Sequence, residues 1–206
     1  MLVVDRLTWE EQEVADGMPV TTLVRFPHCC KSTGFSVLVN FPAGWERTNS
    51  GYYESTEEVL VLNGSLIMSD SELKENDYGW YPAGYLREDS KSQQGALVFA
   101  WFSGPARWKR ATSTPADLGF DPTAVIHENS DNISQETDLF NSRNSKKLRS
   151  DEFGSTWLVE GTRAVFVPKN CMVNMFLVAE KTWYSIGPEE ELPALESKIL
   201  LRVMHL

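Results

Sequence analysis

The stretch from Gly51 to Gly104 constrains the fold of this chain more than any other part of the sequence. It contains two strand-rich blocks of similar design, GYYESTEEVLVLNGSL and DYGWYPAGYLRED followed by QQGALVFAWFSGP. Each block has polar residues on approach, an apolar run of period two, and a glycine at a turn. Short strands at this spacing, with glycine or proline at nearly every joint, are typical of an antiparallel sandwich or barrel. We therefore expect an all-β chain.

Similar patterns occur on both sides of this stretch. Apolar runs indicate strands in PVTTLVRF and FSVLVNF before it, and in STWLVEG, RAVFVP and CMVNMFLVAEKTWYSI after it. The Asn63-Gly64 pair between two apolar runs predicts a hairpin turn. In the tail, Pro188 followed by three glutamates resembles the first turn of a helix. We expect a helix there, followed by a closing strand in SKILLRVMHL.

Composition and charge narrow the classes of partner. The 206 residues include 19 basic and 29 acidic side chains, which gives a net charge of −10. Nucleic acid and anionic membranes both demand a basic face, so we expect neither as a partner. No apolar run is long enough to span a bilayer, and the acidic N-terminal region is unlike a signal peptide. With three cysteines and no disulfide framework, these features predict a cytoplasmic protein.

Two short motifs in the central stretch resemble those of the cupin superfamily, and in particular bacterial cupin proteins with a second, often degenerate, cupin half. In that family the first motif has two histidines one residue apart, then a glutamate, then a glycine that ends the strand. Here EEVLVLNGSL supplies the glutamate and the terminal Gly64. The second motif is Pro-x-Gly followed after two residues by histidine, and PAGYLR supplies all but the histidine.

The resemblance covers residues 20–105 well and residues 155–206 loosely. It implies a cupin double-stranded β-helix, a jelly-roll-like barrel, over residues 1–105. A polar connecting segment would follow over 106–154, and then a degenerate second cupin half or packing extension over 155–206. Cupins commonly form dimers through sheet edges, which in any case need covering, so the resemblance also implies a homodimer.

The family's chemistry implies three histidines and one glutamate that bind a divalent metal inside the barrel. This sequence departs from that pattern at every histidine, because the three positions fall on Gly51, Tyr53 and Arg87. The glutamate is present, as Glu57 or Glu58. One carboxylate beside a fixed guanidinium would bind a divalent ion weakly, so we expect no metal and no other cofactor. The histidines of the chain, all outside the two motifs, are His28, His127 and His205.

Arg87 gives the sharpest expectation for the site. If its side chain points into the barrel, it places a permanent cation where the family has a metal, and Glu57 or Glu58 would be its partner, since a buried charge needs pairing. In one interpretation the two form a structural ion pair. In another, the guanidinium binds the carboxylate or enolate oxygen of a small ligand, with the Tyr53 hydroxyl as a second contact. In a third, Arg87 points to solvent.

Three hypotheses for the function follow. The one we favour is a metal-free small-molecule binding protein for a carboxylate or enolate-like ligand. Its candidate ligand-binding residues are Tyr53, Glu57, Glu58, Arg87, Trp45 and Trp101. The alternative is a cupin enzyme, either a dioxygenase with atypical ligands or a metal-independent isomerase or lyase, with Glu58 as general base and Arg87 stabilising an oxyanion. A degenerate cupin retained for protein–protein contact is the third.

Overall fold

The computed structural model describes residues 2–3, 8–13, 20–26, 34–115, 121, 124–137, 140, 142, 144–151 and 154–205. Over these residues the regular structure is antiparallel strand, apart from one single-turn 3-10 helix, η2 (Ser130–Asn132). The expectation of an all-β chain is therefore confirmed. Among the described residues, no helix has the length and apolar character needed to cross a membrane.

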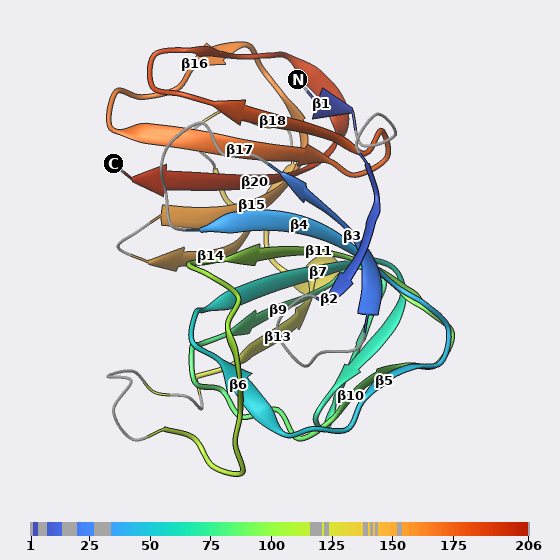
Figure 1. Ribbon diagram of the computed structural model, residues 1–206. Helices are drawn as coiled ribbons and strands as arrows, with labels where there is room; N and C mark the ends of the chain where they lie inside the picture. The colour runs from blue at the N-terminus through green and yellow to red at the C-terminus, as the bar shows by residue number, and fades with distance from the viewer. Residues whose placement is uncertain are drawn as a thin grey trace. The chain divides into compact units, whose positions relative to one another are not determined.

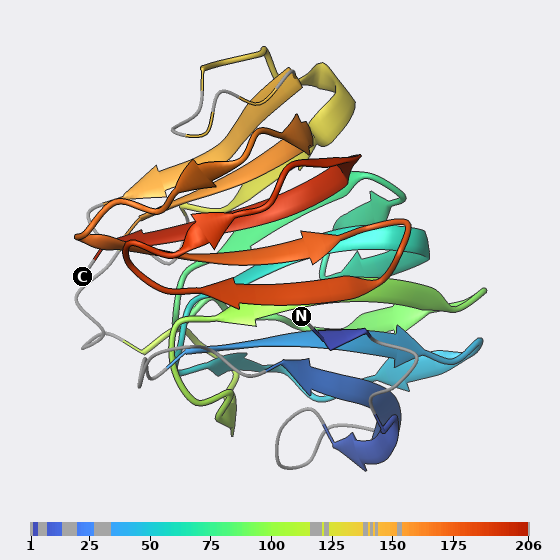
Figure 2. The ribbon, with the colours of Figure 1, turned by 90° about the horizontal axis from the view of Figure 1, so that it is seen from above.

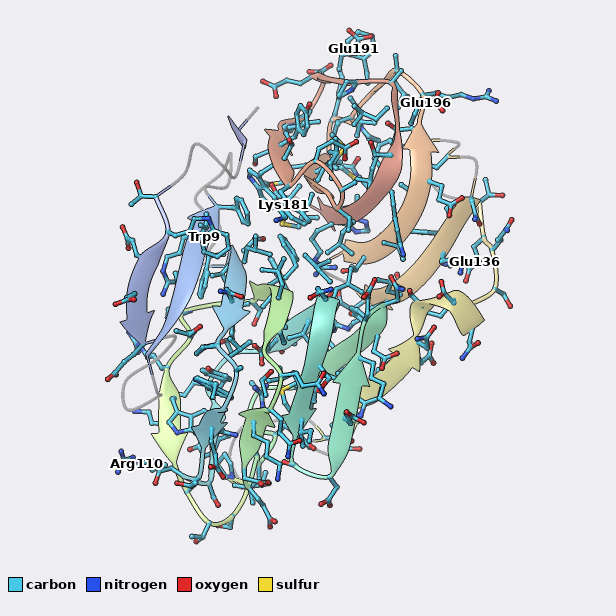
Figure 3. All side chains as sticks on the ribbon, turned by 90° about the vertical axis from the view of Figure 1, so that its right-hand side faces the viewer. Trp9, Arg110, Glu136, Lys181, Glu191 and Glu196 are labelled. Carbon is cyan, nitrogen blue, oxygen red and sulfur yellow. The ribbon has the colours of Figure 1, made fainter. Side chains whose placement is uncertain are left out.

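The chain folds as two compact units (Figure 1). The barrel unit comprises Trp9–Phe26 and Ser32–Asn129. The C-terminal unit comprises Met1–Thr8, Pro27–Lys31 and Ser130–Leu206, so the first residues of the chain belong to it. In both units the strands enclose apolar side chains, while the labelled charged side chains of Arg110, Glu136, Glu191 and Glu196 project outward (Figure 3).

The barrel unit is built around one long strand, β7. Its strands are β2 (Glu10–Glu13), β3 (Val20–Phe26), β4 (Phe35–Phe41), β5 (Trp45–Arg47), β6 (Gly51–Tyr53), β7 (Glu57–Met68), β8 (Ser71–Lys74), β9 (Asp77–Tyr81), β10 (Ser90–Ser92), β11 (Ala96–Phe102), β12 (Trp108–Arg110) and β13 (Ile126–Asn129). The main sheet has the order β13-β9-β7-β11-β4-β3-β2. The second half of β7 also pairs with β8 and β10, β10 pairs with β5, and β6 pairs with β12.

Alternation along these strands produces the core of the barrel unit. In β11, Val98, Ala100 and Phe102 belong to the central apolar cluster, and Val59 and Val61 of β7 belong to the same cluster. These residues are two apart within each strand, and the side chains of a strand alternate between the two faces of a sheet. One face of β7 and β11 therefore points into the barrel.

The Asn63-Gly64 pair does not form the expected hairpin turn. Strand β7 runs through it, and the register with β11 shifts between Leu97 and Val98, so the pair lies at a β-bulge. Gly64 has φ +78°, which a glycine adopts without strain, and it lies against the backbone of Gly95. The prediction of a hairpin turn was wrong because a glycine with a left-handed backbone angle occurs in β-bulges as well as in turns. The chain reverses instead between β7 and β8, at Ser69, φ 52°.

Gly64→Ala is expected to lower the free energy of unfolding by about 2–4 kcal/mol. A Cβ at this position would lie 2.2 Å from the carbonyl oxygen of Gly95, which is backbone and cannot move aside. Gly44→Ala is the matched control, since Gly44 has φ +77° and its Cβ would have nothing within 4 Å. Urea denaturation of both variants measures the difference, and equal losses would show that only the backbone angle matters.

The C-terminal unit is a six-stranded antiparallel sheet with the order β1-β18-β17-β20-β15-β14 and a separate β16–β19 pair. Its antiparallel strands, coloured orange to red, run side by side in Figure 2. The strands are β1 (Leu2–Val3), β14 (Asn144–Asp151), β15 (Gly154–Thr162), β16 (Val165–Phe166), β17 (Cys171–Leu177), β18 (Thr182–Ile186), β19 (Glu191–Leu192) and β20 (Leu195–His205). Its hydrophobic cluster includes Trp157, Phe140 and Cys171, and the unit also buries the polar side chains of Asn174 and Arg202.

Two parts of the sequence differ from their expected structure. Residues 106–154, read as a polar connection, contain β12, β13 and β14. The helix expected from Pro188 is absent: Pro188 and Glu189 form a turn, and Glu189 has φ 60°, which an α-helix cannot contain. The closing strand expected after it is present as β20.

Candidate functional site

A cavity lies inside the barrel unit, between the inward faces of its strands. The space open to water-sized molecules is about 30 Å³, enough for about two waters. Most of its wall is apolar, and the polar side chains that reach it come from β5, β6, β7 and β10 and from the segment after β9. The cavity is lined by Val39, Phe41, Trp45, Arg47, Tyr53, Glu57, Val59, Leu66, Met68, Arg87, Ser90, Val98, Ala100 and Phe102.

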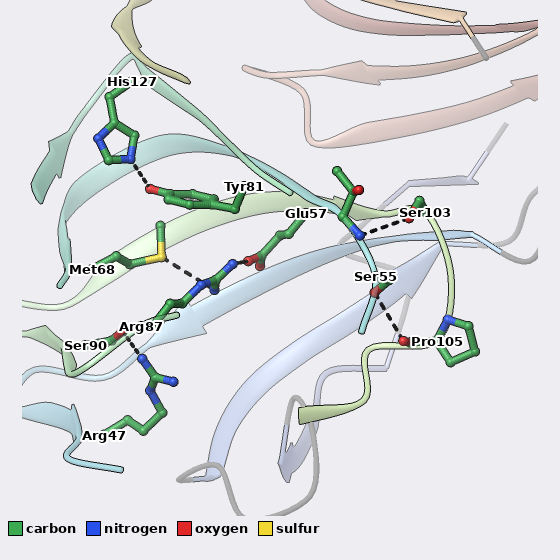
Figure 4. Close-up of polar contacts among 11 residues, drawn as sticks. Arg47, Ser55, Glu57, Met68, Tyr81, Arg87, Ser90, Ser103, Pro105 and His127 are labelled. Atoms are coloured by element: carbon green, nitrogen blue, oxygen red, sulfur yellow. Dashed lines mark hydrogen bonds and ion pairs between the residues drawn. The ribbon is translucent and has the colours of Figure 1, made fainter. Parts of the chain in front are cut away.

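Arg87 lies inside this cavity and forms an ion pair with Glu57 (Figure 4). Its Nη2 is 2.5 Å from Oε2 of Glu57, and its Nη1 contacts Sδ of Met68 at 3.8 Å. The side chains of Arg87 and Glu57 are only 6% and 9% exposed, so water screens the pair little. Burial lowers the pKa of Arg87, but Glu57, Tyr53 and Tyr81 raise it, and the net direction is upward. Arg87 is therefore a permanent cation.

Backbone pairing fixes the position of Arg87. Arg87 and Gly51 form an antiparallel bridge, in which each N–H donates to the carbonyl of the other at 2.8 Å and 3.0 Å. Gly84 of the Pro-x-Gly motif, with φ 80°, donates its N–H to the carbonyl of Tyr53. The two motifs are thereby held side by side. As a result the structure brings Gly51, Tyr53, Glu57 and Arg87 together, although 36 positions separate the first from the last.

Tyr53 lies in the cavity wall with its ring edge-on to Phe102 and Trp108. The Cζ of Arg87 lies 5.0 Å from the centre of this ring and 4.7 Å from that of Tyr81, within the range of cation–π attraction. Burial and the charge of Glu57 raise the pKa of the Tyr53 hydroxyl, so this group stays protonated and can donate a hydrogen bond.

The register of β7 separates the two adjacent glutamates. Glu57 pairs with Phe102, and its side chain lines the cavity. Glu58 pairs with Trp101, and residues directly opposite each other share one face of a sheet. The carboxylate of Glu58 accepts a hydrogen bond of 2.8 Å from the Tyr78 hydroxyl. Glu58 and Trp101 are therefore directed away from the cavity that the sequence had suggested for them, whereas Trp45 lines it.

Arg47 is the site residue that the sequence interpretation missed. It is 1% exposed and lines the same cavity. Its Nη2 donates to Oγ of Ser90 at 2.5 Å, and its guanidinium stacks on Trp108, with Cζ 4.0 Å from the ring centre. A signal was present in the sequence, because residues two apart in a strand share a face and Trp45 was already a pocket candidate. The observed burial follows that pattern, with Trp45 and Arg47 buried and Glu46 exposed.

One histidine lies near the cavity wall. Nε2 of His127 on β13 is 2.6 Å from the hydroxyl of Tyr81, whose ring packs against Arg87 (Figure 4). Burial and the charge of Arg87 lower the pKa of His127, so the neutral imidazole is favoured. His205 ends β20 in the C-terminal unit and is exposed, and His28 lies outside the described residues. Neither motif places a histidine in the cavity.

The cavity residues do not fit the divalent metal that the fold family implies. Among the described residues of the cavity wall the only carboxylate is that of Glu57. It is already paired with Arg87, and a guanidinium repels a divalent cation. Among the described residues there is no group of three histidine, cysteine or acidic side chains that could hold a metal ion. A side chain at Gly51 would also be blocked, since its Cβ would lie 2.3 Å from the carbonyl oxygen of Lys109 and 2.6 Å from the Trp108 ring.

The sequence matches no family model and no curated protein. Solved structures do resemble the fold. A protein from Nostoc punctiforme described as a candidate dioxygenase superposes with a TM-score of 0.78 at 16% identity, over 98% of this chain and 81% of that one. Ylba from Escherichia coli gives a TM-score of 0.59 at 11% identity, over 100% and 85%.

A third structure, an oxalate decarboxylase from Bacillus subtilis, gives a TM-score of 0.52 at 9% identity, over 98% of this chain and 76% of that one. These are cupin-fold proteins, and each likeness covers nearly the whole of this chain. The likeness confirms the expected fold. At identities this low it carries no activity over to this chain.

Proposed function

We propose that this chain, which has the fold of the cupin superfamily, binds a small carboxylate inside its barrel unit without a metal. The observation that carries the proposal is the Arg87–Glu57 ion pair in the cavity, at the positions where the family motifs have a metal ligand pair. Arg47 lies in the same wall, so two guanidinium groups face one carboxylate. An interior with excess positive charge attracts an anion and repels a divalent cation.

The remaining groups in the cavity wall suit a small carboxylate. A guanidinium has planar donors that match carboxylate oxygens, and Nε of Arg87 has no hydrogen-bond partner among the described residues. The protonated hydroxyl of Tyr53 supplies a further donor. The apolar wall, which includes Val98 and Ala100, suits a short carbon chain. One structural neighbour is by name an oxalate decarboxylase, so a protein with this fold acts on a small carboxylate.

The alternative of a cupin enzyme has less support. Its general base was to be Glu58, whose carboxylate accepts the Tyr78 hydroxyl on the face away from the cavity. Glu57 faces the cavity, but its carboxylate is already held by Arg87 and is not free to take a proton from a ligand. Binding without chemistry therefore remains the function that we favour.

The proposal is tested by thermal denaturation with sodium formate, acetate and oxalate at constant ionic strength in the presence of EDTA. We expect at least one of them to raise the Tm by about 5–10 °C at about 100 times its Kd. Ala100→Leu, which extends a side chain into the cavity, should abolish the rise; Ala100→Val is the milder version if the larger residue prevents folding. No rise with any carboxylate, a rise that EDTA removes, or a rise that both variants keep would contradict it.

A further inference from the structure

The charges that face the cavity are unequal. Of the wall residues that the structure describes, Glu57 is the only acidic one, and the ion pair with Arg87 neutralises it. Arg47 lies in the same wall at 1% exposure. Its direct contacts among the described residues are the Ser90 hydroxyl and the Trp108 ring, both uncharged, and the charges of Glu57 and Asp89 act on it without an ion pair. A buried cation without an anionic partner is unfavourable, because burial removes its hydration. The described side chains that line the cavity therefore carry one more positive than negative charge, and the cation without an ion pair is Arg47.

The hydrogen bonding of Arg47 is incomplete as well. Only Nη2 donates to a described acceptor, Oγ of Ser90, and both Nε and Nη1 lack a hydrogen-bond partner among the described residues. Buried donors are almost always satisfied in folded proteins, by protein groups, by water or by a ligand. In agreement with this, burial and the neighbouring charge of Arg87 lower the pKa of Arg47 to about 10, although Tyr53, Glu57 and Asp89 act in the opposite direction. An anion beside Arg47 would supply both the missing acceptors and the missing charge.

We infer that Arg47 is the anchor for a small monocarboxylate anion of the size of formate or acetate. This inference rests on the proposed function and sharpens it, because it names the binding residue and the ligand class. Arg87 then has a secondary role. Glu57 holds its guanidinium in an ion pair, so Arg87 adds positive charge beside the ligand but is not the ligand's main binding partner. Arg47 was absent from the residues that the sequence suggested. It has two donor atoms without a hydrogen-bond partner among the described residues, whereas Arg87 has one.

The size and the charge of the expected ligand both follow from the cavity. Its free space is about 30 Å³, which holds about two waters, so a ligand of three or four non-hydrogen atoms replaces the water without moving the wall. One net positive charge balances one carboxylate. A dicarboxylate such as oxalate would leave one negative charge against Val59, Val98 and Ala100, where it has no partner. The structure therefore favours monocarboxylates over dicarboxylates and short chains over long ones.

The experiment is isothermal titration of the full chain with sodium formate, acetate, butyrate, oxalate and chloride, at constant ionic strength set by gluconate. We expect formate or acetate to bind with a Kd of about 1 mM or tighter. Butyrate, oxalate and chloride should bind more weakly. Arg47→Met keeps the length of the side chain and removes the charge, and it should weaken formate and acetate binding about 10- to 100-fold. Arg110→Met, at an exposed position, is the matched control and should leave binding unchanged.

The possible outcomes show whether the role of Arg47, the ligand class or the proposed function itself is wrong. Carboxylate binding that Arg47→Met leaves intact would overturn the role of Arg47 while the proposed function stands. Tighter binding of oxalate or butyrate than of acetate would overturn the ligand class, and so would chloride binding as tight as formate binding. No binding of any carboxylate would overturn both, and would mean that water alone satisfies Arg47. Should Arg47→Met fail to fold, the size series on the unaltered protein still decides the ligand class.

Discussion

Arg87→Met is expected to lower the free energy of unfolding by about 3–5 kcal/mol, because it leaves the carboxylate of Glu57 buried without its partner. The pair is at 2.5 Å and is nearly inaccessible to water, so neither solvent nor salt compensates for the loss. In a protein of this size such a loss corresponds to a fall in Tm of about 6–20 °C. Urea denaturation of the wild type and the variant measures it.

Two further variants show whether the loss of stability in Arg87→Met comes from the buried ion pair. Lys109→Met removes the cation of an exposed ion pair, 3.5 Å from Glu54, and should cost about 1 kcal/mol or less. The double variant Arg87→Met with Glu57→Leu replaces the pair by apolar side chains and should recover most of the loss. A loss below about 1 kcal/mol in Arg87→Met would show that the pair is not a buried ion pair. A double variant as unstable as the single one would assign the effect to packing.

Glu57→Ala is expected to be rescued by acetate. The variant leaves the guanidiniums of Arg87 and Arg47 without a carboxylate in the cavity wall, which should destabilise the protein by about 3–5 kcal/mol. It also leaves space where the carboxylate of Glu57 was. Added acetate can occupy that space and restore the missing charge, so acetate should raise the Tm of the variant more than that of the wild type.

The control for rescue is the same titration on Arg87→Met, which retains the carboxylate and lacks the cation. Acetate should raise its Tm less than that of Glu57→Ala, since the carboxylate of Glu57 repels a second anion. Sodium gluconate at the same concentration separates specific binding from ionic strength. Equal effects of acetate on both variants would mean that the rise does not come from the site of Glu57.

The fold could be predicted from sequence because its signals are local and repeated. Alternating apolar runs with glycine or proline at the joints indicated strands over most of the chain, and the resemblance of the Glu57-Glu58 pair, Gly64 and the Pro-x-Gly motif to cupin motifs implied the cupin fold. Two signals failed for the same reason. Asn63-Gly64 was expected to form a turn, but β7 pairs with β11 through it and forms a bulge there. A helix was expected from Pro188, but Glu189 adopts a left-handed backbone angle that a helix cannot contain. Tertiary pairing decided both, and no short segment contains that information.

The candidate site was predicted less completely. The positions of Gly51, Tyr53 and Arg87 followed from the motifs, and the structure brings them together. The choice between Glu57 and Glu58 could not be made, because adjacent residues face opposite sides of a strand and a shift of one position exchanges them. Arg47 was missed because it belongs to no motif. The role of Arg47 depends on two contacts with residues far away in the sequence. Ser90 of β10 pairs with it across 43 positions, and Trp108 of β12 stacks on it across 61 positions.

The metal content of the purified protein tests most directly the claim that a guanidinium–carboxylate pair stands where the fold family has a metal. The protein is produced in medium supplemented with manganese, iron, nickel, copper and zinc, purified without chelators, desalted and measured by elemental analysis. We predict less than about 0.1 equivalent of any of these metals per chain, because the part of the chain that the structure describes places only the carboxylate of Glu57 in the cavity wall, and Arg87 holds it. About one equivalent of a single metal, retained through desalting, would contradict the account.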